Sequence, residues 1–194
     1  MKASGVIPLI IMVIFVVLAL NRRALKGLKT LRKGNPYQRM REMLFSLTYA
    51  SLNFRARLEG KPIFALMELN LSGDIATLAI VADGSISLYL STGGMITGGG
   101  RHERVREAGA RFFAKAKEAL ALMNKVEDYH PPAEGEVCFY VKNQEGVFGY
   151  CASEKDLRAG KDPLSQLYVL GHKVLTELRK ISPQSRPLPR LYIS

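Results

Sequence analysis

Residues 63–90 read IFALMELNL-SGD-IATLAIVA-DG-SISLYL, and this stretch decides the fold. Its three apolar runs are separated by Ser72-Gly73-Asp74 and by Asp83-Gly84, and turn residues between such runs are typical of β-hairpins. The stretch therefore predicts three consecutive antiparallel strands. Because residues 75–82 are apolar at nearly every position, we expect the middle strand to be central in the sheet, with both faces covered.

A second hairpin is predicted further along the chain. Residues 136–141 and 147–152 are strand-like and flank residues 143–146, which would form a four-residue loop. Such a loop pairs Lys142 with Val147 and places Cys138 opposite Cys151. The residues expected on the other, core-facing side of this hairpin are Val137, Phe139, Val141, Phe148 and Tyr150.

Two helices are predicted from a capping residue followed by proline. Asn35-Pro36 begins one helix over residues 36–52, and Asp162-Pro163 begins another that ends at Ile181. Both segments carry apolar residues at the three-and-four spacing of an amphipathic helix. The alternation of apolar and basic residues over 53–58 fits a continued helix or an edge strand equally well.

The same spacing predicts a helix over residues 103–124, and Gly109 on its apolar face predicts a close backbone crossing. The order helix, three strands, helix, two strands, helix indicates an α+β sandwich over residues 35–182. We expect an antiparallel sheet of about five strands with three helices packed on it. This layout resembles the profilin-like and roadblock-type modules at the level of element order only, and such a resemblance implies no function.

The N-terminal 21 residues have the composition of a transmembrane anchor. Residues 6–20 are apolar without a break, and residues 3–5 extend the uncharged stretch to eighteen residues, about the minimum for spanning a bilayer. A cleaved signal peptide is the alternative, with a weak cleavage site at residues 17–19. The single cation before the stretch and the arginines directly after it favour a retained, single-pass anchor.

The cations that flank residues 1–21 predict the orientation of the chain. Lys2 precedes the apolar stretch, and the basic segment 22–34 follows it with six cations. Lys and Arg are retained on the cytoplasmic side, so we expect the domain to face the cytoplasm from the cell membrane. There the two thiols should be adjacent but reduced. The residues expected at the anionic leaflet are Arg22, Arg23, Lys26, Lys29, Arg32 and Lys33. The equally favoured alternative is a solvated charged linker that only sets the topology.

The positive charge is concentrated beside the predicted anchor. Residues 21–61 hold eleven Lys or Arg against two Glu, whereas residues 62–194 hold sixteen against fifteen Asp or Glu. Nucleic acid is therefore not an expected partner, because the body of the chain is almost neutral and no aromatic residues interleave with the cations. The tail 183–194 is rich in proline and is expected to pack along the domain or fray. The alternative is an extended polyproline-like segment that docks in a groove.

One glycine-rich loop is the only candidate ligand site. It lies between a predicted strand and a predicted helix, where backbone N–H groups can face an anion. Its candidate ligand-binding residues are Gly93, Gly94, Gly98, Gly99, Gly100, Arg101 and His102. The alternative is that the glycines only form a tight connection. In that case alanine should be tolerated wherever φ is negative and should cost about 1 kcal/mol where φ is positive.

No arrangement of residues specifies a reaction. The loop lacks the lysine and hydroxyl residue of a Walker motif, and no paired acid and base or nucleophilic elbow is present. Two cysteines are too few for a zinc site, and no cofactor is indicated. The expected function is a membrane-tethered interaction or scaffolding module, whose partner is another protein or a second copy of the chain. The alternative is a phosphate-ligand sensor or an enzyme that uses the loop.

Overall fold

The computed structural model describes residues 35–52 and 61–181. The predicted anchor 1–21, the basic segment 22–34, residues 53–58 and the tail 183–194 lie outside these ranges. In chain order the described elements are α3 (Pro36–Ser46), η1 (Ala50–Leu52), β1 (Phe64–Leu71), β2 (Asp74–Val81), β3 (Ile86–Leu90), β4 (Met95–Ile96), η2 (Gly99–Arg101), α4 (Glu103–Ala119), η3 (Leu120–Leu122), β5 (Asn124–Val126), β6 (Glu136–Asn143), β7 (Gly146–Ser153), α5 (Glu154–Arg158) and α6 (Ser165–Ile181).

The strands form one antiparallel sheet in the order β4-β3-β2-β1-β6-β7-β5. The predicted three-strand unit is confirmed, because β2 pairs with β1 on one side and with β3 on the other. Its turns use backbone conformations that glycine adopts without strain, with φ values of 98° at Gly73 and 85° at Gly84. Strand β2 is buried from Ile75 to Val81, as its apolar sequence predicted.

The register predicted for the second hairpin is also confirmed. Lys142 lies opposite Val147, and Cys138 lies opposite Cys151. The pairing extends to Asn143 and Gly146, so the connection is two residues shorter than predicted. Strand β6 pairs with β1 along its other edge and brings this hairpin into the same sheet.

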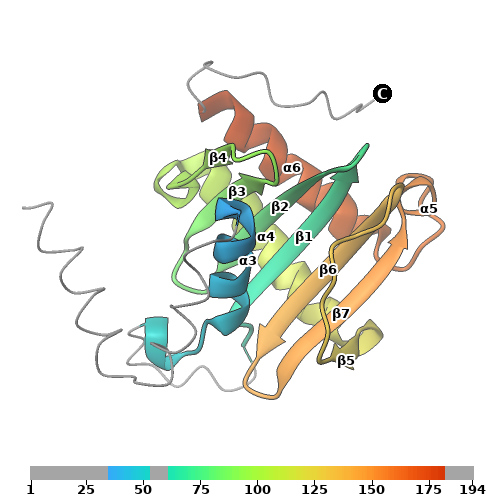
Figure 1. Cartoon of the computed structure of the whole chain (residues 1–194), viewed down its shortest axis with the longest axis horizontal. Coiled ribbons are helices and arrows are strands. Elements are labelled where there is room, and N and C mark those ends of the chain that lie inside the picture. Colours follow the sequence, from blue (N-terminus) through green and yellow to red (C-terminus); the bar gives the residue numbers. More distant parts are fainter. Residues whose placement is uncertain (1–34, 53–60, 182–194) are drawn as a thin grey trace, which may run out of the picture.

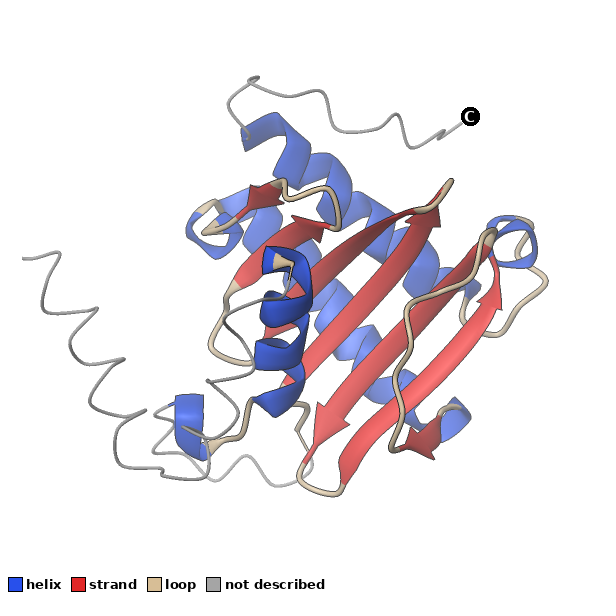
Figure 2. Ribbon diagram, viewed as in Figure 1, coloured by secondary structure: helices blue, strands red, loops and turns tan. Residues whose placement is uncertain are grey.

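Helices cover both faces of the sheet, as Figures 1 and 2 show. Helices α4 and α6 lie side by side on one face, and α3 crosses the other face in front of the central strands. Together with the single turn of α5, these are the α-helices of the described residues. The result is the predicted α+β sandwich with three main helices.

The larger core lies between the sheet and the pair α4 and α6. Along α4 the buried positions are Val105, Gly109, Phe112, Ala116 and Ala119, which is the amphipathic face that the spacing predicted. A Cβ atom on Gly109 would lie 2.4 Å from Ile86 Cδ1. The predicted close crossing at Gly109 is therefore confirmed, with the side chain of Ile86 as its contact.

The smaller core lies between the sheet and α3. Its main members are Tyr37, Leu44 and Phe45 of α3, which pack on the face of the sheet that carries Phe64 and Tyr140. Phe45 contacts both of these rings edge-on, with ring centroids 5.5 and 5.4 Å away. The first predicted helix therefore packs on the sheet in a defined position.

Two predicted helices end earlier than expected. Helix α3 stops at Ser46 rather than at residue 52, and Thr48 and Ser51 exchange side-chain and backbone hydrogen bonds just beyond it. Such local bonds compete with the helical pattern. Helix α4 stops at Ala119, and a 3-10 turn then leads into strand β5 at Asn124.

The sheet has seven described strands rather than about five. The two additional strands are short and lie at the edges, β4 beside β3 and β5 beside β7. Strands of two or three residues have too short an alternation to be recognised from sequence. Among residues 35–52 and 61–181, no helix is long and apolar enough to cross a membrane.

Candidate functional site

A buried ion pair joins α3 to the centre of the sheet. Glu68 of β1 is fully buried, and a buried carboxylate needs a partner because it has lost its water. Arg41 of α3 supplies it through two parallel bonds, from Nε to Oε1 at 2.8 Å and from Nη2 to Oε2 at 2.9 Å. This two-pronged geometry is the strongest form of a carboxylate–guanidinium contact.

The second acceptor position of Glu68 Oε1 is used by the neighbouring strand. Thr77 Oγ1 of β2 donates to this oxygen at 2.9 Å. Because that bond uses the single hydroxyl proton of Thr77, Tyr37 of α3 must donate to Thr77 Oγ1, at 2.8 Å. Burial raises the pKa of Tyr37 to about 12, which keeps this donor protonated.

Arg41 also holds the connection between β5 and β6. Its Nη1 donates to the backbone oxygen of Tyr129 at 2.7 Å. The guanidinium carbon lies 4.8 Å from the ring centroid of Phe45, and the ring of Tyr129 stacks on that of Phe45 at 3.9 Å. We call Tyr37, Arg41, Glu68, Thr77 and Tyr129 the α3 clamp. Its polar side chains from α3, β1 and β2 hydrogen-bond to one another, and this network fastens α3 to the sheet.

The cysteines extend the row of residues that contains Glu68. Glu68 lies opposite Cys138, and Cys138 lies opposite Cys151. The two cysteines form a disulfide with a Cα–Cα distance of 4.1 Å, so the expectation of reduced thiols is wrong for this structure. Adjacent thiols can oxidise without backbone movement. Cys138 is buried, whereas Cys151 is exposed to solvent.

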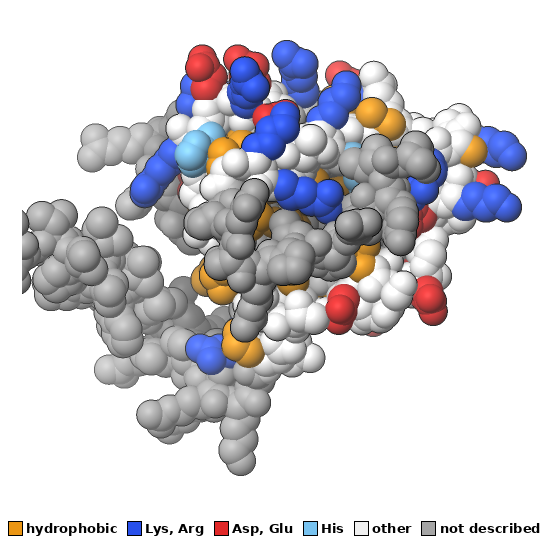
Figure 3. All heavy atoms as spheres, turned by 90° about the horizontal axis from the view of Figure 1, so that it is seen from above, with side chains coloured by type: hydrophobic (Ala, Val, Ile, Leu, Met, Phe, Trp, Pro, Cys, Tyr) orange, Lys and Arg blue, Asp and Glu red, His pale blue; other side chains and the backbone are white. Residues whose placement is uncertain are grey.

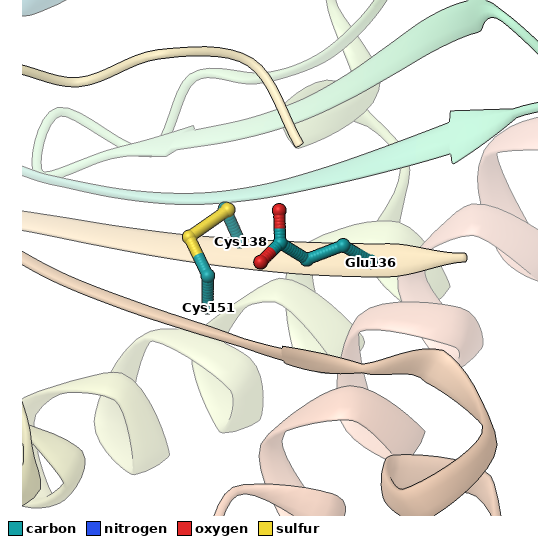
Figure 4. A group of neighbouring side chains, drawn as sticks. All are labelled: Glu136, Cys138 and Cys151. Carbon is teal, nitrogen blue, oxygen red and sulfur yellow. A yellow bond between two sulfur atoms is a disulfide. The ribbon is translucent and has the colours of Figure 1, made fainter. Parts of the chain in front are cut away.

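Glu136 adds a carboxylate beside this disulfide, and Figure 4 shows the three side chains together on the β6–β7 hairpin. One carboxylate oxygen and the two sulfur atoms lie within 4.8 Å of one another. Cysteine binds zinc as a thiolate. The group therefore offers sulfur ligands to a metal only after the disulfide has been reduced.

The glycine-rich loop does not form one continuous cradle. Gly93 and Gly94 form the turn between β3 and β4, and Gly93 has a φ of 93°. Gly98 precedes η2 with a φ of 76°, and Gly99 begins that 3-10 helix in a buried position. Three cavities of about 630, 230 and 190 Å³ are lined by residues outside Gly93–His102.

Packing explains why Gly99 and Gly100 carry no side chain. A Cβ atom on Gly99 would lie 2.6 Å from Leu178 Cδ2, and one on Gly100 would lie 2.0 Å from the backbone oxygen of Gly84. Neither residue has a positive φ. The expectation that alanine is tolerated wherever φ is negative is therefore wrong at these two positions, because space rather than backbone conformation selects glycine.

Two alanine substitutions in this loop should differ in their effect on stability. Gly98→Ala introduces only positive-φ strain, with nothing within 4 Å of its Cβ, and should cost about 1 kcal/mol. Gly100→Ala forces the loop away from Gly84 and should cost about 2 kcal/mol. Thermal unfolding of the two variants and wild type measures this order. An equal or smaller loss in Gly100→Ala would contradict the packing explanation.

Arg101 and His102 lie at the start of α4, and both are exposed. His102 is the N-cap residue, but its side chain makes no capping hydrogen bond, and Glu103 supplies the acidic residue of the first turn. The loop and the α3 clamp remain separate in the described residues. The predicted leaflet cations, from Arg22 to Lys33, lie outside them.

The α3 clamp is the feature that the sequence interpretation missed. Its signal was Glu68, the single charged residue in the otherwise apolar run 63–69. A charge at such a position must be buried with a partner. The glycine pattern drew attention to the loop instead.

Comparison with known proteins identifies no relative of this chain. The similarity of the element order to profilin-like and roadblock-type modules accordingly stays a prediction. No protein-family model matches the chain, and no curated protein and no solved structure is significantly similar to it.

Proposed function

We propose that this protein is a membrane-tethered interaction module. The observation that carries the proposal is the α3 clamp, because α3 is the first described helix after the predicted anchor and basic segment. The bidentate bonds between Arg41 and Glu68 fix this helix on the sheet. A domain attached in this way would be held in a defined orientation to its tether rather than on a loose linker.

The positive helix layer supports the choice of a protein partner. Helices α4 and α6 together carry eight Lys or Arg against four Glu. A cavity of about 230 Å³ between them is lined by the cations Arg104, Arg111 and Lys173, by the carboxylates Glu107 and Glu177, and by the apolar side chains of Ala108 and Leu170. With three cations against two carboxylates, the groove suits a partner that presents an apolar side chain among charged groups with a small excess of acidic ones.

We propose a cytoplasmic orientation, because the excess of cations after the apolar stretch governs insertion. Thiols are normally kept reduced in the cytoplasm. On this proposal the Cys138–Cys151 disulfide belongs to the oxidised form of the protein, and Cys151 is the exposed residue of the pair.

We do not propose that the glycine-rich loop binds an anion. Turn conformation accounts for Gly93 and Gly98, and close packing accounts for Gly99 and Gly100. The exposed start of α4 alone does not define a ligand.

The tether is tested by expressing the full chain and a variant that lacks residues 1–21. The full chain should stay with membranes after alkaline carbonate extraction, and the shortened variant should not. Protease added to intact cells should spare the domain. Release of the full chain, or a mature N-terminus near Leu20, would refute the tether. Digestion of the domain, together with a disulfide that persists in cells, would refute the cytoplasmic orientation but not the tether.

The interaction is tested by charge reversal in the groove. Arg111→Glu combined with Lys173→Glu should remove cross-links that the wild-type chain forms in cells. Lys155→Glu is the matched control, because Lys155 is an exposed cation of α5 outside that groove. Unchanged cross-links in the double variant, or equal loss in the control, would contradict the assignment of this face.

A further inference from the structure

The described chain begins at one identifiable end of the domain. Asn35 caps α3 by accepting a hydrogen bond from the backbone N–H of Tyr37 at 3.0 Å. Its Nδ2 also donates to the backbone oxygen of Ser91 at 3.3 Å. Ser91 follows directly on β3 and leads into β4. The point where residues 1–34 join the domain is therefore next to the turn between β3 and β4.

This end of the domain also exposes an apolar side chain. Met95 of β4 is 55% exposed, the largest value among the large hydrophobic residues described. It pairs through the backbone with Tyr89 of β3 and projects from a two-residue edge strand. An exposed, flexible apolar side chain at such a position can contact a membrane or another molecule.

Exposed cations follow Met95 in the chain and lie at the end of α6. Arg101 and Arg104 follow it in η2 and α4 and are exposed, as is the His102 side chain between them. Neither arginine forms an ion pair with another described residue. The end of α6 approaches the same loop, because Gly99 packs on Leu178. The exposed Lys180 lies two residues beyond Leu178.

We call Met95, Arg101, His102, Arg104 and Lys180 the anchor-side surface. The view onto the end of the molecule that carries β4 and the end of α6 shows Lys and Arg side chains there, with Asp and Glu and some apolar side chains between them (Figure 3). Glu103 is the exposed acidic residue inside this group, and Glu177 pairs with Lys180. The surface keeps a net positive charge.

We infer that the anchor-side surface docks on anionic lipid headgroups, with Met95 placed among them. The inference rests on the proposed membrane tether. The fourteen residues between Leu20 and Asn35 span about 20 Å if helical and about 50 Å if fully extended. The tether would enter the domain beside this surface and hold the surface close to the bilayer. Because the tether raises the local concentration of headgroups at the surface, each cation needs to contribute only a weak attraction.

The chain contains no tryptophan, so a single Met95→Trp substitution introduces a unique fluorescent probe at the surface. Leu122→Trp is the matched control. Leu122 is 50% exposed and follows the far end of α4, a helix of 17 residues, which spans about 25 Å. The full chain with either substitution is reconstituted into vesicles of phosphatidylcholine alone or of phosphatidylcholine and phosphatidylserine in equal parts.

In the anionic vesicles the tryptophan at position 95 should shift to the blue and be quenched by brominated acyl chains several-fold more than the tryptophan at 122. Adding Arg101→Glu and Arg104→Glu to the Met95→Trp chain should abolish this difference. Full quenching in phosphatidylcholine alone would overturn the role of the cations. Equal quenching at the two positions would overturn the assignment of the surface.

Flotation of the same samples separates the two proposals. If the full chain fails to float with the vesicles, the membrane tether itself is refuted. If the chain floats while the tryptophan at 95 stays unquenched in anionic vesicles, the tether stands and the docking inference is refuted.

Discussion

Replacing Arg41 by methionine is expected to lower the free energy of unfolding by about 3 to 5 kcal/mol, because it leaves the carboxylate of Glu68 buried without its ionic partner. Glu68 is fully buried, and Arg41 supplies two of its hydrogen bonds. Methionine keeps much of the apolar stem of arginine, so the loss reports on the charge rather than on packing. Urea unfolding of the full chain, followed by circular dichroism, measures the change.

The double variant Arg41→Met with Glu68→Gln is the first control. It removes both charges and should regain most of the lost stability, because a neutral amide costs less to bury than a carboxylate. Lys115→Met is the second control, since the Lys115–Glu118 pair lies on the exposed side of α4. An exposed pair contributes at most about 1 kcal/mol. A loss in Arg41→Met no larger than that in Lys115→Met would mean that the clamp does not fasten α3.

The same substitution also bears on function. If α3 orients the domain on its tether, Arg41→Met should reduce the quenching of a tryptophan at position 95 while the chain still floats with vesicles. A domain that is destabilised but still folded would then have lost its fixed orientation relative to the membrane. Unchanged quenching would show that the anchor-side surface finds the membrane without the clamp.

The order of the main elements was predictable because each depended on a local signal. Asp83-Gly84 fixed one hairpin, and the short loop after Lys142 fixed the register that places Cys138 opposite Cys151. Register follows from loop length once two strands are recognised. The amphipathic face of α4 was equally local.

What the sequence left open depended on contacts between distant segments. Glu68 and Arg41 are 27 residues apart, and Arg41 and Tyr129 are 88 apart. A single sequence does not show which buried charges meet. The short strand β4 likewise exists only because β3 offers it a partner.

Acidification from about pH 7.5 to pH 4 is expected to remove about 3 kcal/mol of stability through His172 of α6. Burial lowers the pKa of His172 to about 4; the carboxylate of Glu154 acts in the opposite direction, while Arg158 and Arg179 add to the lowering. Both ring nitrogens are buried without a hydrogen-bond partner among the described residues. The ring packs on Tyr168 with centroids 4.3 Å apart.

The sign follows from where the proton binds. The unfolded chain takes up a proton at His172 near pH 6.5, whereas the folded chain does so only near pH 4. Between these values the unfolded state holds more protons, so stability rises with pH across this window and the contribution is complete above it. Below pH 4 both states are protonated and no further loss arises from this residue.

His172→Phe tests this expectation, because phenylalanine keeps an aromatic ring against Tyr168 and cannot be protonated. The difference in free energy of unfolding between variant and wild type, measured from pH 4 to pH 7.5, should change by about 3 kcal/mol in favour of the variant at the acidic end. Taking the difference cancels the titration of the carboxylates common to both chains. His102→Gln, at an exposed histidine, controls for the loss of a histidine as such. Parallel profiles for wild type and His172→Phe would mean that His172 is solvated or paired in the folded protein, and its burial in α6 would then not make the domain sensitive to acid.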